Sequence, residues 1–258
     1  MEIYIGNKKI VSGTKIIIYD ILLWSSNICA LFVYLECICK VHRKYRVSFR
    51  LDKCDFLKPR VEYVRHDVTN DGNCPASTKF SMINDRKIPE RGENLFSFIG
   101  LINFYHRYAP YMEIRLKPLR KLLKQYYRKT IHIMACIPDL ISIFEELKVT
   151  IISSPMLARF DPLKPTFLKI DWSGEEMGWT LMQPTDDIES TKATNVLLKC
   201  GECTYDFSKD GVRLNPVRFG SRAYTDFERK YHSFVGEAPS GRCAISQNRH
   251  YLWGTNFW

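Results

Sequence analysis

Residues 98–108 read FIGLINFYHRY, and this stretch decides the fold. Its apolar side chains, together with Leu95, recur every three or four residues, which is the spacing of one face of an α-helix. Pro110 follows at the point where such a helix has to end. The sequence therefore predicts an amphipathic helix over residues 94–109. The same spacing predicts a second helix over residues 113–128, with Leu116, Leu119, Leu122 and Leu123 on its apolar face.

The second predicted helix has charges of almost one sign on its polar face. Glu113 is the only acid in the segment. A helix face that meets only water usually mixes both signs, whereas a face of one sign suits a surface that follows phosphate groups. A plain solvated face is the alternative. The candidate nucleic-acid-binding residues on this face are Arg115, Lys117, Arg120, Lys121 and Lys124.

Upstream of these helices lies a very apolar segment, residues 16–39. Its longest uncharged run, residues 21–35, is shorter than the roughly 20 residues that span a bilayer. We therefore expect a buried strand over residues 16–23 and a helix over residues 28–41 rather than a membrane anchor. Residues 60–68 predict a further short strand.

Downstream, the pattern changes from helices to strands. A third helix is predicted over residues 139–152, and residues 167–171 and 178–182 predict a hairpin. Residues 216–222 predict another strand. Thr225 and Glu228 have the spacing of a capping box that opens a helix, and Gly236 and Pro239 are expected to end or kink it. The order of elements favours an α+β or α/β fold.

The composition fits a globular protein with a basic excess. The chain has 258 residues, 45% of them hydrophobic, and a net charge of +10. An excess of this size suits polyanionic partners such as nucleic acid. The nine cysteines are scattered, and the one Cys-x-x-Cys, Cys200 with Cys203, has no second pair at a distance that would complete a zinc site. Free thiols and an intracellular location, in cytoplasm or nucleus, are the expectation.

Four blocks, taken in order, resemble the Pol polyprotein of gypsy-type LTR retroelements. The first three are IIYDILL at residues 17–23, RLDKCDF at 50–56 with VEYVRH at 61–66, and FIGLINFYHRY at 98–108 with KPL at 117–119. The first block is similar to the strand turn of the reverse transcriptase palm. The second is similar to the stretch that follows this turn in the family, and the third to the family's next block downstream. The fourth runs from FEELK at 144–148 through DWS at 171–173 and GSRA at 220–223 to RHYL at 249–252.

The resemblance implies a division of the chain into three parts. Residues 1–92 are expected to be the end of a reverse transcriptase palm with a thumb remnant. Residues 93–135 are expected to be a helical connection. Residues 136–258 are expected to be an incomplete ribonuclease H-like α/β domain, truncated before its last catalytic strand.

Polymerase chemistry, by this resemblance, requires acidic residues that hold magnesium. The family has an Asp-Asp pair at the palm turn, and here Tyr19 stands at the first position while Asp20 remains. A phenol is not ionised at neutral pH and does not replace a carboxylate on magnesium. We therefore expect no polymerase activity, with Asp20 as a palm remnant.

Ribonuclease H chemistry, by the same resemblance, requires clustered carboxylates and two metal ions. Asp171 matches the Asp of the first strand, and Glu237 matches the helix Glu. These two are the candidate catalytic residues and a weak Mg²⁺ site. The next ligand is expected past Trp258.

The sequence thus predicts a degenerate retrotransposon Pol segment, related to RNA-directed DNA polymerase and ribonuclease H, that is non-catalytic and keeps residual nucleic-acid binding. The expected partner is an RNA–DNA hybrid or other nucleic acid, bound without sequence preference, or the remainder of a Pol polyprotein. No membrane partner is expected, and Mg²⁺ is the cofactor only if the protein is active. One alternative is a metal-dependent ribonuclease H-type hydrolase, if the product continues past residue 258. Another is a small protein anchored in a membrane through residues 16–39.

Overall fold

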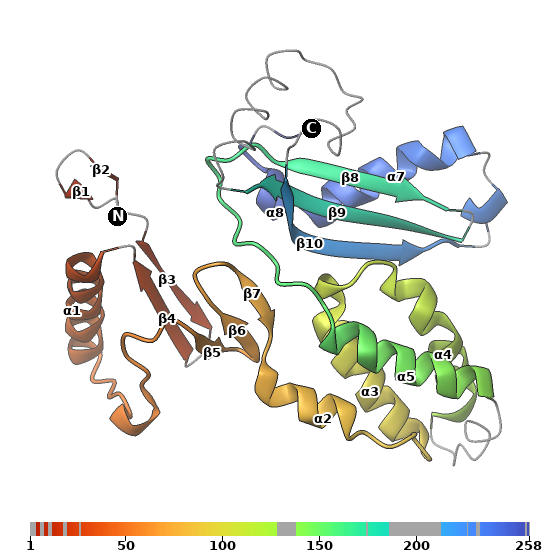
Figure 1. Ribbon diagram of the computed structural model, residues 1–258, viewed down its shortest axis with the longest axis horizontal. Coiled ribbons are helices and arrows are strands. Elements are labelled where there is room, and N and C mark those ends of the chain that lie inside the picture. Colours follow the sequence, from red (N-terminus) through yellow and green to blue (C-terminus); the bar gives the residue numbers. More distant parts are fainter. Residues whose placement is uncertain are drawn as a thin grey trace. The chain divides into compact units, whose positions relative to one another are not determined.

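The computed structural model describes residues 4–5, 8–9, 12–17, 20–25, 27–127, 138–173, 175–185, 213–225, 227–230, 233–255 and 257 (Figure 1). The chain divides into two compact units, Met1–Asn70 and Asp71–Trp258. The three-part division expected from the family resemblance, at residues 92 and 135, is a finer one and stays a prediction.

The first unit consists of hairpins and one long helix. Strands β1 (Tyr4–Ile5) and β2 (Lys8–Lys9) pair antiparallel, as do β3 (Ser12–Ile17) and β4 (Asp20–Ser25). Helix α1 (Ile28–Lys44) follows, then a 3₁₀ turn (Leu51–Lys53) and a third hairpin of β5 (Val61–Tyr63) and β6 (His66–Val68). The helix predicted over residues 28–41 is confirmed. The single strands predicted over residues 16–23 and 60–68 are wrong, because each segment folds back on itself as two strands.

Helix α1 is capped but largely uncovered. Asn27 accepts hydrogen bonds from the backbone N–H groups of Cys29 (2.8 Å) and Ala30 (3.3 Å), which satisfies the first turn. Ala30 is the buried residue of α1, whereas Phe32 is 56% exposed. Among the described residues, no helix is long and apolar enough to cross a membrane.

The second unit begins with β7 (Asn73–Pro75) and a group of helices. These are α2 (Phe80–Asn84), α3 (Gly92–Tyr105), α4 (Met112–Tyr126) and α5 (Pro138–Ile152), with a 3₁₀ turn (His106–Tyr108) after α3. The apolar faces predicted from the sequence meet in one core, where the rings of Phe98 and Phe144 lie 4.2 Å apart. The three predicted helices are therefore confirmed, with ends that differ by a few residues.

A three-stranded antiparallel sheet follows the helices. Its strands β8 (Phe167–Trp172), β9 (Glu176–Pro184) and β10 (Leu214–Ala223) lie in the order β10-β9-β8. The predicted hairpin is confirmed, with Asp171 opposite Gly178. Thr225 and Glu228 form the predicted capping box, which leads into a 3₁₀ turn (Glu228–Lys230), helix α7 (Ser233–Gln247) and helix α8 (Arg249–Leu252).

The two faces of this sheet are covered by different helices. Leu168 and Trp172 of β8 pack with Ala244 of α7, which runs along the sheet (Figure 1). Gly236 of α7 lies so close to Trp172 that an added Cβ would come within 2.1 Å of the indole nitrogen. Gly236 and Pro239 do not end α7, because the helix continues through both while packed on the sheet, and a kink at these residues stays a prediction. The opposite face of the sheet meets α4 and the turn before it.

Candidate nucleic-acid interface and the Asp171 pocket

Three of the five candidate basic residues on α4 are held in contacts within the protein. Arg115 lies 3.3 Å from a Glu146 carboxylate oxygen and donates to the Thr150 hydroxyl at 2.9 Å. Arg120 donates both Nη groups to the carboxylate of Glu113, and Nη2 also donates to the Asn103 side-chain oxygen at 2.9 Å. These contacts brace α4 against α3 and α5. The two arginines are thereby partly neutralised.

The third is Lys117, whose ammonium lies 3.4 Å from the Glu175 carboxylate. Both side chains are largely exposed, at 40% and 60%, so this pair contributes little to stability. Lys121 and Lys124 are exposed and form no ion pair with any described residue. The structure therefore leaves two of the five candidates, one turn apart on α4, with their charge open to solvent.

The N-terminus of α4 is capped by side chains from the sheet. Glu176 of β9 accepts a hydrogen bond from the backbone N–H of Ile114 at 3.0 Å. Ser221 of β10 accepts one from the backbone N–H of Glu113 at 3.1 Å. These N–H groups have no partner inside the helix, and a carboxylate there also suits the helix dipole. Burial raises the pKa of Glu176, while the hydrogen bond from Ile114 acts in the opposite direction.

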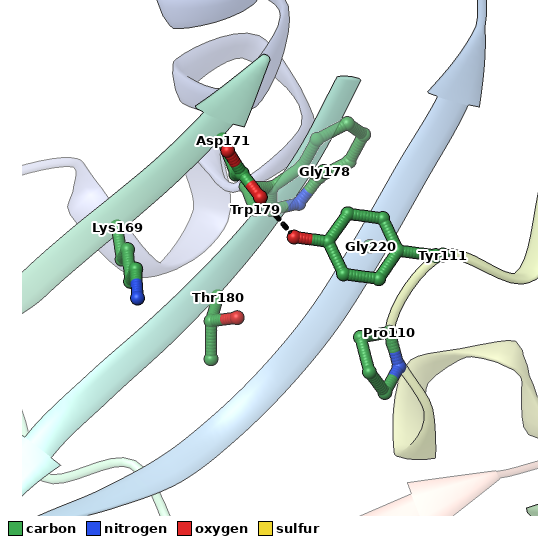
Figure 2. Close-up of a pocket in the computed structure, with 8 residues that line it drawn as sticks. All are labelled: Pro110, Tyr111, Lys169, Asp171, Gly178, Trp179, Thr180 and Gly220. Atoms are coloured by element: carbon green, nitrogen blue, oxygen red, sulfur yellow. Dashed lines mark hydrogen bonds between the residues drawn. The ribbon is translucent and has the colours of Figure 1, made fainter. Parts of the chain in front are cut away.

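Tyr111, the residue before α4, joins the helix to β8. Its hydroxyl donates a hydrogen bond to the Asp171 carboxylate, as Figure 2 shows. That hydrogen bond is the largest cause that raises the pKa of Tyr111 to about 12, followed by burial and the nearby negative charges. The ring lies against Gly178, where an added Cβ would come within 2.6 Å of it. Tyr111 has a φ of 55°, the left-handed region that is rare for bulky residues, so the surrounding contacts hold it there.

A small pocket surrounds this hydrogen bond. Its volume is about 80 Å³, whereas sites for small organic ligands usually have several hundred. Lys169 and Thr180 stand beside the Tyr111–Asp171 pair in Figure 2. The pocket therefore has room for a few water molecules but not for a nucleotide. The lining residues are Pro110, Tyr111, Lys169, Asp171, Gly178, Trp179, Thr180 and Gly220.

The three candidate carboxylates lie in different surroundings. Asp171 points toward Tyr111. Helix α7, which carries Glu237, packs on the β8 side chains that alternate with Asp171 and so lie on the other face of the sheet. Asp171 therefore faces away from the helix of Glu237, which is itself exposed. Asp20 begins β4 in the first unit, and Tyr19 lies outside the described residues. Within the described ranges, no three His, Cys, Asp or Glu side chains gather as metal ligands would.

Tyr111 and Glu176 were not among the residues singled out from the sequence. A tyrosine between a proline and a helix gives no local signal of a bond to a strand 60 residues away. Glu176 follows Glu175 in a segment that reads as a solvated turn. Cys200 and Cys203 lie outside the described residues.

The fold is similar to part of the retroviral reverse transcriptase fold. Two solved structures of similar fold are a foamy viral protease-reverse transcriptase dRH with double-stranded DNA and a foamy viral protease-reverse transcriptase with an RNA/DNA hybrid. Both matches cover 95% of this chain with a TM-score of 0.75. The first is 18% identical and spans 38% of the foamy viral chain. The second is 17% identical and spans 29% of its foamy viral chain. At this identity the likeness shows the fold alone.

Sequence comparison gives the relationship. The chain is 27% identical to the Retrovirus-related Pol polyprotein from transposon 297 of Drosophila melanogaster, over 92% of this chain and 19% of the relative. It is also 27% identical to the Transposon Tf2-3 polyprotein of Schizosaccharomyces pombe, over 52% of this chain and 10% of the relative. No family model matches the chain. The chain is a relative of retrotransposon Pol polyproteins. It spans 19% of the Drosophila polyprotein and 10% of the Schizosaccharomyces pombe one.

Proposed function

We propose that this chain is a non-catalytic, nucleic-acid-binding segment of a retrotransposon Pol lineage. Residues 1–92 would correspond to the end of a reverse transcriptase palm and a thumb remnant. Residues 93–135, with α3 and α4, would correspond to the helical connection, and residues 136–258, with α5, the sheet and α7, to a ribonuclease H-like domain. The partner would be an RNA–DNA hybrid or another nucleic acid, held by its phosphates.

The observation that carries the binding proposal is the pair of unpaired lysines on α4. Lys121 and Lys124 are exposed, without a described acidic partner, on a helix whose other basic residues are held in internal contacts. A contact with a phosphate backbone needs such charges, because binding replaces counterions on the nucleic acid with protein cations. Similar folds have been solved in complexes with double-stranded DNA and with an RNA/DNA hybrid, which supports this class of partner.

The non-catalytic part of the proposal rests on the carboxylates. A two-metal site needs several carboxylates on one spot. The described residues do not fit that arrangement, since Asp171 is bonded to Tyr111 and faces away from α7. We therefore expect no magnesium-dependent cleavage of an RNA–DNA hybrid. Cleavage that is lost in Asp171→Asn would favour the hydrolase alternative instead.

The binding test is a fluorescence anisotropy titration of a labelled RNA–DNA hybrid at two salt concentrations. We expect weak binding that falls with salt. Lys121→Gln/Lys124→Gln should lower the slope of log affinity against log salt by about 1.5, because each of the two lost phosphate contacts accounts for roughly 0.7 to 0.9 of the slope. The matched control is Lys53→Gln/Lys87→Gln, which removes two exposed lysines elsewhere. Equal slopes for both double variants, or no binding at low salt, would reject the proposal.

A further inference from the structure

Two arginines of the second unit lie on elements that pack against each other at the β10 edge of the sheet. Arg107 lies in the 3₁₀ turn after α3, and Arg218 lies in β10, the last strand in the order β10-β9-β8. The pairing of β10 with β9 is irregular between Pro216 and Arg218, and such bulges re-aim a side chain. Burial lowers the pKa of Arg218, the nearby Tyr251 acts in the opposite direction, and the positive charge of Arg107 lowers the pKa further.

Among the described residues, no acid forms an ion pair with either guanidinium. Arg107 donates Nη2 to the Tyr108 hydroxyl at 3.4 Å, and Arg218 donates Nη1 to the Gln247 carbonyl at 3.3 Å. The Nε atoms of both arginines are buried without a hydrogen-bond partner, and in the described part of the chain neither residue forms an ion pair. A half-buried cation beside another cation is unfavourable unless an anion joins them. An anion bound by both side chains would offset this unfavourable arrangement of charge.

The surroundings add aromatic rings and a further arginine. His250 of α8 is close enough that Arg218 lowers its pKa, after the larger effect of burial. The His250 ring lies 4.1 Å from that of Tyr251, centre to centre. Nearby, Arg249 stacks over Trp253, which is 75% exposed. Basic groups interleaved with aromatic faces are the means by which proteins hold single nucleic-acid strands, through phosphates and stacked bases.

We propose that Arg107 and Arg218 bind a phosphate group of a nucleic-acid strand at the β10 edge. His250 lies at the rim of this site, and the exposed Trp253 offers a stacking surface for a base. The site is separate from Lys121 and Lys124, and it relies on the proposed function only for nucleic acid as the source of the phosphate. Its anion chemistry stands on the two arginines alone.

The test uses the full chain with two probes, inorganic phosphate followed by thermal unfolding and a labelled oligothymidylate followed by anisotropy. Arg218→Gln and Arg107→Gln are each expected to weaken both interactions by about tenfold, the effect of losing a charge-assisted hydrogen bond. Without phosphate, Arg218→Gln should unfold at the same or a higher temperature, because it removes a like-charge neighbour. The matched control, Arg242→Gln, removes an exposed arginine of α7 and should bind like the wild type.

The outcomes separate this site from the α4 surface. Normal binding by Lys121→Gln/Lys124→Gln together with loss in Arg218→Gln would reject the α4 proposal and support the β10 site. Equal stabilisation of the wild type and Arg218→Gln by phosphate would overturn the site. Phosphate binding that needs Arg218, with oligothymidylate binding that does not, would overturn the assignment to nucleic acid.

Discussion

The hydroxyl of Tyr111 donates a hydrogen bond to the carboxylate of Asp171, and this bond ties the start of α4 to strand β8. Two further bonds act at the same place, from the backbone of α4 to Glu176 and Ser221. The carboxylate that family resemblance assigns to catalysis therefore has a structural partner in this chain. The helical part and the sheet of the second unit are joined by these side chains as well as by apolar packing.

We expect Tyr111→Phe and Asp171→Ala each to lower the free energy of unfolding by about 1 kcal/mol, the usual net contribution of one hydrogen bond. Because both changes remove the same bond, the double variant should lose little more than either single one. Urea denaturation of the four proteins measures this cycle. Fully additive losses would show that the two side chains stabilise the fold independently.

The same bond predicts a late-titrating tyrosine. The pKa of Tyr111 is raised to about 12 from its ordinary value of 10. Since the folded pKa lies above the unfolded one, the stability from this group is fully present below pH 10 and is lost as the pH rises from 10 through 12. The tyrosinate absorbance of wild type minus Tyr111→Phe should therefore titrate near 12. A difference curve centred at 10 would contradict the bond.

Local patterns were sufficient for the helices of the second unit. The spacing in residues 98–108 placed α3, and the leucines of residues 116–123 placed α4, because helical amphipathicity is written over neighbouring residues. The hairpin of β3 and β4 was missed. The sequence between Ile17, where β3 ends, and Asp20, where β4 begins, lacks the Gly, Asn or Pro that usually mark a two-residue turn.

The candidate sites show where such patterns stop being informative. Five basic residues on α4 looked equivalent in the sequence, yet three of them form ion pairs in the structure. Two of their acidic partners, Glu146 and Glu175, lie outside α4. The electrostatic influence of Arg107 on Arg218 likewise joins residues more than a hundred positions apart. Which charge stays free is set by tertiary neighbours, and these are not visible in spacing.

Glu176 gives a prediction that separates capping from charge. Glu176→Gln keeps an oxygen that accepts from the Ile114 N–H and removes a buried charge, so its stability at neutral pH should equal or exceed that of the wild type. Glu176→Ala removes the cap and should cost about 1 kcal/mol or more. Thermal unfolding of both variants at neutral pH provides the comparison. A Gln variant as unstable as the Ala variant would mean that the charge itself is required.

The acid range should reveal the capping box of Glu228. Its carboxylate accepts from both Nη groups of Arg222, at 3.1 and 2.6 Å, and from the Thr225 N–H at 2.9 Å. The hydrogen bonds from Arg222 are the largest cause that lowers the pKa of Glu228 to about 2, followed by that from Thr225. Since the folded pKa lies below the ordinary 4.5, this stability is present above pH 4.5 and is lost as the pH falls through about 2.

Glu228→Gln should therefore lose about 1 kcal/mol at neutral pH, where the ion pair with Arg222 is partly exposed, and should approach the wild type as the pH falls to 2. The matched control is Glu237→Gln, which removes an exposed carboxylate of α7 that bonds to no described residue. Urea denaturation at a series of pH values gives both difference curves. If Glu228→Gln and Glu237→Gln follow the same curve, Glu228 does not hold the start of the segment that leads into α7. A convergence seen only for Glu228→Gln would identify the Arg222–Glu228 pair as the contact that holds this turn beside β10.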